Sequence, residues 1–107
     1  MVNNNNRLNL IAIITILKTK ALSKPIPIVH VIIEGTENAD KIKGGNGNDR
    51  ITGNNGDDTL NGGLGDDKLF GNDGTDKLNG ELGDDDLEGG KGNDKIKGES
   101  GDDRLIG

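Results

Sequence analysis

The sequence predicts an all-β fold: a right-handed parallel β-roll (a solenoid) of about four coils, preceded by an N-terminal strand-rich cap or leader. Three observations predict it. A period of nine residues runs from Gly35 onward, glycine recurs at fixed places within the period, and each period carries one isoleucine or leucine at the same place. All 19 glycines lie at or after Gly35. We therefore expect two parts: an apolar leader or set of capping strands over residues 1–34 and a repeat block over residues 35–107.

Written in nines, the repeat block gives eight units: GTENADKIK, GGNGNDRIT, GNNGDDTLN, GGLGDDKLF, GNDGTDKLN, GELGDDDLE, GGKGNDKIK and GESGDDRLI. The first position is glycine in all eight units, and the fourth is glycine in all but the first, where Asn38 stands. The eighth position is isoleucine or leucine throughout: Ile42, Ile51, Leu60, Leu69, Leu78, Leu87, Ile96 and Leu105. The sixth position is always aspartate: Asp40, Asp49, Asp58, Asp67, Asp76, Asp85, Asp94 and Asp103.

Each unit reads as a tight turn followed by a short strand. Glycine at the first and fourth positions permits backbone angles that side chains disfavour, so the first six residues are expected to turn. The last three residues alternate polar, apolar and polar, as in Arg50-Ile51-Thr52, which points the middle side chain inward. Two units close one coil, and units of odd and even number then stack in two separate parallel sheets.

This stacking predicts calcium sites between the turns. Adjacent strands lie about 4.8 Å apart, and Ca²⁺ takes six to eight oxygen ligands at about 2.3–2.6 Å. An ion between two stacked turns can therefore reach carboxylates and backbone carbonyls from both. Pairing aspartates 18 residues apart gives up to six Ca²⁺ ions, of which the first is weakened because its turn lacks the second glycine. Since the chain has no cysteine, any metal must be held mainly by oxygen.

The expected ligands are of two kinds. The first kind is the eight sixth-position aspartates named above. The second kind is the set of first- and fourth-position glycines of units two to seven: Gly44, Gly47, Gly53, Gly56, Gly62, Gly65, Gly71, Gly74, Gly80, Gly83, Gly89 and Gly92. The acidic residues at the fifth position contribute to the local negative field rather than to direct ligation: Asp57, Asp66, Asp84 and Asp102.

The charge of the repeat block supports a cation as its ligand. It contains 18 acidic and nine basic residues, a net charge of −9, whereas residues 1–34 carry a net charge of +3. Crowded carboxylates repel one another without counter-ions, and eight inward apolar side chains form a small core. We therefore expect calcium binding to drive folding of the block. The basic residues at the seventh position are expected on outward strand faces, where they favour solubility.

The same features exclude other functions. An acidic block does not suit nucleic acid, which requires positive charge to meet its phosphates. The sequence contains no H-E-x-x-H or G-x-S-x-G motif and no set of residues able to form a nucleophile–base pair. We therefore expect no catalytic residues and no enzyme activity.

The N-terminal part contains two apolar runs, Leu8–Leu17 and Ile26–Ile33. Neither is long enough to span a bilayer as a helix, so no membrane span is expected. Three interpretations stay open: a secretory signal, strands of which the second enters the roll and caps its first rung, or sequence that belongs to a longer parent or is foreign to the domain. His30, the only histidine, is expected to have a structural role in a strand because no second nitrogen or sulfur ligand accompanies it.

The repeat resembles the repeats-in-toxin (RTX, haemolysin-type) calcium-binding family, whose unit is G-G-x-G-x-D-x-U-x with U large and apolar. The resemblance covers residues 35–106 and implies a Ca²⁺-binding module of a secreted bacterial protein, exported by type I secretion and located outside the cell. An alternative function is a structural or adhesive surface element in which calcium-stabilised rolls join end to end. The chain ends one residue after the last unit, so we expect an uncapped strand edge there and self-association through it.

Overall fold

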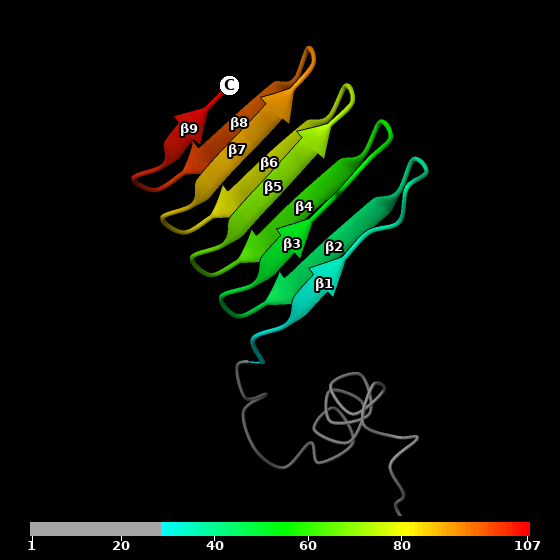
Figure 1. Ribbon diagram of the computed structural model, residues 1–107. Coiled ribbons are helices and arrows are strands. Elements are labelled where there is room, and N and C mark those ends of the chain that lie inside the picture. The colour runs from blue at the N-terminus through cyan, green and yellow to red at the C-terminus, as the bar shows by residue number, and fades with distance from the viewer. Residues whose placement is uncertain (1–28) are drawn as a thin grey trace, which may run out of the picture.

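The computed structural model describes residues 29–107. The first apolar run therefore lies outside the described residues. Within residues 29–107 all regular structure is strand, and nine strands wind into a β-solenoid of about four turns (Figure 1). The strands are β1 (Ile32–Glu34), β2 (Lys41–Asn46), β3 (Arg50–Thr52), β4 (Thr59–Leu64), β5 (Lys68–Asp73), β6 (Lys77–Leu82), β7 (Asp86–Lys91), β8 (Lys95–Ser100) and β9 (Arg104–Ile106).

The strands form two parallel sheets, as the two-unit coil predicts. One sheet has the order β1-β3-β5-β7-β9 and the other β2-β4-β6-β8. Each strand pairs with the strand two places later, and its residues face those 18 positions on, such as Ile51 opposite Leu69 and Leu60 opposite Leu78. The period of nine therefore sets the register, because equal units return the chain to the same place after every second turn.

The core is a single file of eighth-position side chains between the sheets. Ile51, Leu60, Leu69, Leu78 and Leu87 are at most 2% exposed, and Ile42 and Ile96 pack partly against them. Leu105, on the last strand, is 48% exposed. Each strand thus supplies one large inward side chain, and its neighbours in the sequence point outward.

Several strands are longer than the three residues expected. β5, for example, continues past Phe70 to Asp73, because its backbone keeps pairing with β7 as far as Asp73 opposite Lys91. The second apolar run of the N-terminal part supplies β1, which pairs with β3 and places Ile33 opposite Ile51. The end of this run, Ile32 and Ile33, therefore lies in a strand at the edge of the five-stranded sheet. No helix occurs within residues 29–107 that is long and apolar enough to cross a membrane.

Candidate calcium sites

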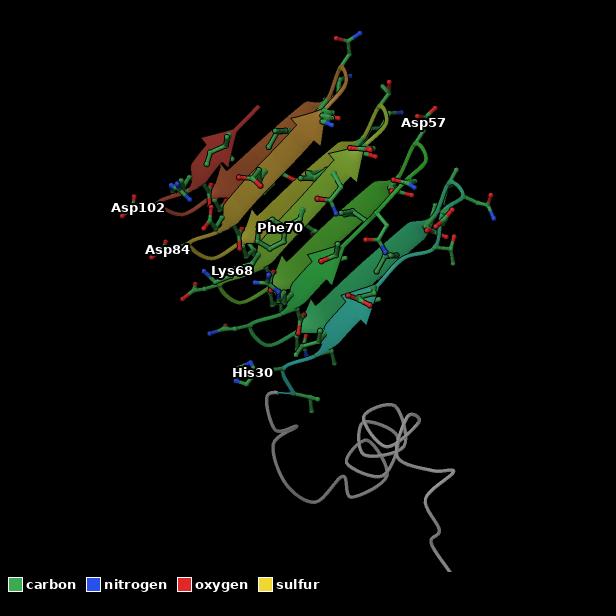
Figure 2. The ribbon with its side chains drawn as sticks, in the orientation of Figure 1. His30, Asp57, Lys68, Phe70, Asp84 and Asp102 are labelled. Carbon is green, nitrogen blue, oxygen red and sulfur yellow. The ribbon has the colours of Figure 1, made fainter. Side chains whose placement is uncertain are left out.

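The turns lie along two edges of the solenoid. Units of odd number turn at one edge and units of even number at the other, so the sixth-position aspartates form two columns. Figure 2 marks these edges: Asp57 lies on one, whereas Asp84 and Asp102 lie on the other, which His30 also borders. The columns consist of Asp40, Asp58, Asp76 and Asp94 on the first edge and of Asp49, Asp67, Asp85 and Asp103 on the second.

A ladder of hydrogen bonds runs through each column. The Asp49 backbone N–H donates to Asp67 Oδ1 at 2.7 Å, and the Asp67 N–H donates to Asp85 Oδ1 at 2.7 Å. The four other pairs expected from the 18-residue spacing have the same bond at 2.7–2.9 Å: Asp40 to Asp58, Asp58 to Asp76, Asp76 to Asp94 and Asp85 to Asp103. One oxygen of each accepting carboxylate is thus used to join two turns.

In six of the sixth-position aspartates the second carboxylate oxygen has no hydrogen-bond partner in the protein. Five of the aspartates are no more than 2% exposed: Asp49, Asp58, Asp67, Asp76 and Asp85. In these five, and in Asp94, the Oδ2 atom is buried and accepts no hydrogen bond from the protein. Leaving a buried polar atom unpaired is costly, and more so when it carries charge. A positively charged partner at each of these oxygens would therefore stabilise the folded chain.

The glycines at the first position keep space open in front of these oxygens. A Cβ atom placed on Gly44 would lie 2.7 Å from the Gly62 carbonyl oxygen and against Asp49 Oδ2. A Cβ on Gly71 would likewise lie 2.7 Å from the Gly89 carbonyl oxygen and against Asp76 Oδ2. A carboxylate oxygen and a carbonyl oxygen from the next coil thus border the same small space, and an all-oxygen donor set of this kind fits Ca²⁺.

The fourth-position glycines allow the turns to stack closely. Gly56 and Gly74 have φ angles of 98° and 126°, which side chains rarely adopt. A Cβ on Gly74 would collide with the Gly56 carbonyl oxygen of the preceding coil. The same holds along both edges, for example where Gly65 lies over the Gly47 carbonyl. The backbone carbonyls therefore come within reach of the neighbouring turn, as the calcium prediction requires.

Burial changes the acidity of the central carboxyl groups. The pKa of Asp67 is raised to about 6, mainly by burial and also by the charges of Asp49, Asp85 and Asp66, against the lowering effect of the Asp49 N–H hydrogen bond. Burial is also the main cause that raises the pKa of Asp49, Asp58, Asp76 and Asp85. At neutral pH the ionised columns are therefore destabilised without a cation, and a divalent ion between turns removes that cost.

The first turn differs from the others. Asp40 Oδ2 accepts a hydrogen bond from the Thr36 backbone N–H at 2.6 Å and another from Thr36 Oγ1 at 3.0 Å. Asn38 stands in this turn where later turns have glycine. Protein donors thus satisfy in Asp40 the oxygen that is unpaired in the central turns. In the last turn of the roll, Asp103 is only partly buried, and its Oδ1 atom accepts a hydrogen bond from the Asp85 N–H.

The fifth-position side chains form a second ladder that the sequence did not reveal. Their oxygens accept N–H donors from the following coil, opposite in direction to the sixth-position ladder. Asp66 Oδ1 accepts the Asp84 N–H, and Asp84 Oδ1 accepts the Asp102 N–H, at 2.9 and 2.8 Å. Asp57 does the same for Thr75 on the other edge. These residues therefore stack the turns, in addition to the negative field expected of them.

His30 begins that second ladder. Its Nδ1 atom accepts the Asn48 N–H at 2.7 Å, and Asn48 in turn accepts the Asp66 N–H at 2.9 Å. His30 thus has a structural role, as predicted, but it lies before β1 and beside a turn rather than in a strand. The signal was present in the spacing, because His30 precedes Asn48 by 18 residues.

Within the part of the chain that the structure describes, no three histidine, aspartate or glutamate side chains converge to hold a metal ion. The sixth-position carboxylates are instead spread along the two edges, each beside a backbone carbonyl of the neighbouring coil, as at Gly44 and Gly71. The model of the RTX calcium-binding nonapeptide repeat family matches residues 34–69, 52–87 and 82–107. The chain belongs to this family.

Family and fold together make the chain an RTX calcium-binding repeat module, in which the repeat is a structural element rather than a catalytic one. The overlapping matches extend over all of the solenoid from the end of β1 onward. Comparisons with curated proteins and with solved structures give no match. The donor set fits the ion that the family implies, because all its groups are oxygens and six of the carboxylates have an oxygen left over.

Proposed function

We propose that Ca²⁺ binds between stacked turns and that its binding folds the RTX block of this chain. The observation that carries this proposal is the set of six buried Oδ2 atoms without a partner. The carboxylates of Asp49, Asp58, Asp67, Asp76, Asp85 and Asp94 would hold the ions. The carbonyls of the first- and fourth-position glycines of units two to seven would supply further oxygens. The bound ion provides the positive charge that the buried carboxylates lack.

Dependence of folding on calcium follows from how the solenoid is built. Its fully buried apolar core consists of five side chains. Within each column, the buried carboxylates repel one another when they are ionised. Ordering the chain requires a favourable contribution that this core cannot supply alone. Because each site is shared between two coils, binding one ion orders two turns and prepares the next site.

This mechanism suits a protein that works outside the cell. Extracellular calcium modules bind their ion at about 0.1–1 mM, so a module of this kind stays unfolded at low calcium and folds at high calcium. We propose that the chain is part of a secreted protein exported by the type I route, with residues 1–34 as leader or cap and residues 35–107 as the module. The absence of a catalytic constellation in the sequence supports a binding role rather than an enzymatic one.

A structural role is the second candidate. Leu105 is 48% exposed at the last coil, whereas the leucines below it in the same file are buried. A second roll stacked on this coil would cover it, and rolls joined end to end would form an adhesive or surface element. Sedimentation velocity with and without calcium separates the candidates, since the structural role requires calcium-dependent oligomers.

Far-ultraviolet circular dichroism of the full chain tests the main proposal. The metal-free chain is titrated with CaCl₂, and MgCl₂ is the control because Mg²⁺ is smaller and demands near-ideal octahedral geometry. We expect a coil spectrum to become a strand spectrum at roughly millimolar Ca²⁺, and Mg²⁺ to have little effect. A chain that keeps its coil spectrum in both titrations, or folds equally with both ions, would contradict the proposal.

A further inference from the structure

The outer faces of the two sheets differ in charge. Outward positions on a strand are the seventh and ninth of each unit. On the four-stranded sheet these positions carry five exposed lysines and otherwise only asparagine and threonine: Lys41, Lys43, Lys77, Lys95 and Lys97. No acidic residue occupies them. We call this surface the lysine face. It is a basic surface on a chain whose net charge is −6.

On the five-stranded sheet, three of the corresponding charges form ion pairs. Asp86 lies between Arg104 and Lys68, at 2.9 and 3.8 Å. The Arg50 guanidinium lies 4.6 Å from the centre of the Phe70 ring, on the face where Figure 2 labels Lys68 and Phe70. Within residues 29–107 no ion pair involves a lysine of the lysine face. The five lysine charges are therefore available to an external partner.

A shallow groove crosses the lysine face. Its volume is about 220 Å³, and besides Leu60 and Leu78 at its base it is lined by Thr59, Asn61, Lys77, Asn79, Lys95 and Lys97. The Asn79 Oδ1 atom is buried there without a hydrogen-bond partner. The groove thus combines cationic side chains with amide and hydroxyl groups. The acidic residues of the same strands, Glu81 and Glu99, lie at their far ends, where the chain enters the turns.

We propose that the lysine face binds a linear acidic polysaccharide, one that carries carboxylate or sulfate groups along its length. The lysines would meet its charges, and the asparagine and threonine side chains would bond its hydroxyl groups. Regular rungs about 4.8 Å apart present these groups in rows, which suits an extended repeating ligand. The acidic edges repel a polyanion, so the charge distribution directs it to this face alone.

Other polyanions fit less well. No outward position of the lysine face carries an aliphatic or aromatic side chain, so nothing there could enter a lipid bilayer or stack on a nucleic-acid base. The inference does not rest on the calcium proposal, because the lysines and the groove are separate from the aspartate columns. It requires only that the solenoid be folded.

The test compares two variants of the full chain with equal charge change. One is Lys77→Gln/Lys95→Gln/Lys97→Gln on the lysine face, and the control is Arg50→Gln/Lys68→Gln/Arg104→Gln on the other sheet. Heparin and polygalacturonate are the probes, uncharged dextran is the blank, and affinity is measured by isothermal titration calorimetry in millimolar CaCl₂. Both variants keep the four basic residues of the N-terminal part, so binding there affects them equally.

We expect the lysine-face variant to bind both probes roughly tenfold more weakly than the unaltered chain, because three exposed charge contacts are lost. The control should change much less. Equal losses in both variants, or no binding of either probe by the unaltered chain, would overturn the proposal. So would binding to anionic phosphatidylglycerol vesicles alone, which would assign the face to lipid. Circular dichroism of the same samples establishes that the roll is folded, so a failure here is distinct from a failure of calcium-driven folding.

Discussion

The first turn of the roll and its central turns use the same aspartate in different ways. Both carboxylate oxygens of Asp40 in the first turn accept hydrogen bonds from Thr36, so this carboxylate is satisfied by the protein. Asp67 in a central turn has one oxygen bonded to the Asp49 N–H and the other buried without a partner. The consensus aspartate therefore has a structural function in every turn, whereas an unpaired oxygen distinguishes the turns where we propose that an ion binds.

The largest expected effect comes from the core at the middle of the roll. Replacing Leu69 by alanine empties a fully buried position between the sheets and should lower the free energy of unfolding by about 3 kcal/mol. Ile42→Ala, close to the first turn, should cost less because Ile42 is only partly buried. Urea unfolding at saturating calcium measures both. Equal losses would mean that the first coil is packed as tightly as the centre.

The next prediction compares the two aspartates directly. Asp67→Asn removes a charged oxygen from a candidate site and should reduce the number of ions bound and raise the calcium midpoint several-fold. Asp40→Asn should leave the ion count unchanged, because Thr36 already supplies the donors there. Calorimetric titration gives the stoichiometry. If Asp40→Asn also lowers it, the first turn binds calcium despite its internal hydrogen bonds.

A further prediction concerns substitutions that give the first turn the glycines of the central turns. Thr36→Gly together with Asn38→Gly removes the Thr36 hydroxyl that donates to Asp40 Oδ2, leaving only the backbone N–H of residue 36, and gives the turn both glycines of the repeat. The Gly53 carbonyl oxygen already lies on the same side, 2.6 Å from a Cβ built on Gly35. We expect one additional calcium ion per chain by calorimetry. An unchanged count would show that the first turn lacks a further requirement besides the free oxygen.

The sequence was sufficient to predict the coil, the two parallel sheets and the register, because all of these follow from equal units of nine residues. It also placed the buried file, since Leu60 and Leu69 recur at one position of the unit. It did not predict that Thr36 would bond Asp40, or that Asp66 and His30 would bond the N–H groups of the next coil. The directions of these hydrogen bonds depend on how each peptide plane is tilted within the turn, which the residue pattern alone does not specify.

The charge difference between the sheets does not follow from the unit of nine taken as a single pattern, which shows only that the seventh position is mostly basic. Odd and even units belong to different sheets, so their outward residues must be counted separately. Counted in this way, Lys43 and Lys97 at the ninth position join the lysines of the seventh on one sheet. The sequence repeats every nine residues, but neighbouring positions on one sheet surface are 18 residues apart in the sequence.

The smallest expected effect concerns the second position of the turn. Glu81 has a φ angle of 78°, whereas its neighbour in the sheet is Gly63, with a φ angle of 105°. A side chain in this left-handed region costs roughly 1–2 kcal/mol, and the greater freedom of glycine in the unfolded chain offsets part of the gain from removing it. Glu81→Gly should therefore raise the free energy of unfolding in calcium by about 0.5–1 kcal/mol.

The reverse substitution, Gly63→Glu, is the matched control and should destabilise the roll, because it introduces a side chain into the same backbone conformation against the Gly45 carbonyl oxygen. Both are measured by urea unfolding at saturating calcium. If Glu81→Gly destabilises the protein instead, the Glu81 side chain makes a contribution greater than its backbone cost. The irregular second positions would then be adapted to their coils, and the central turns would differ among themselves as the first turn differs from them.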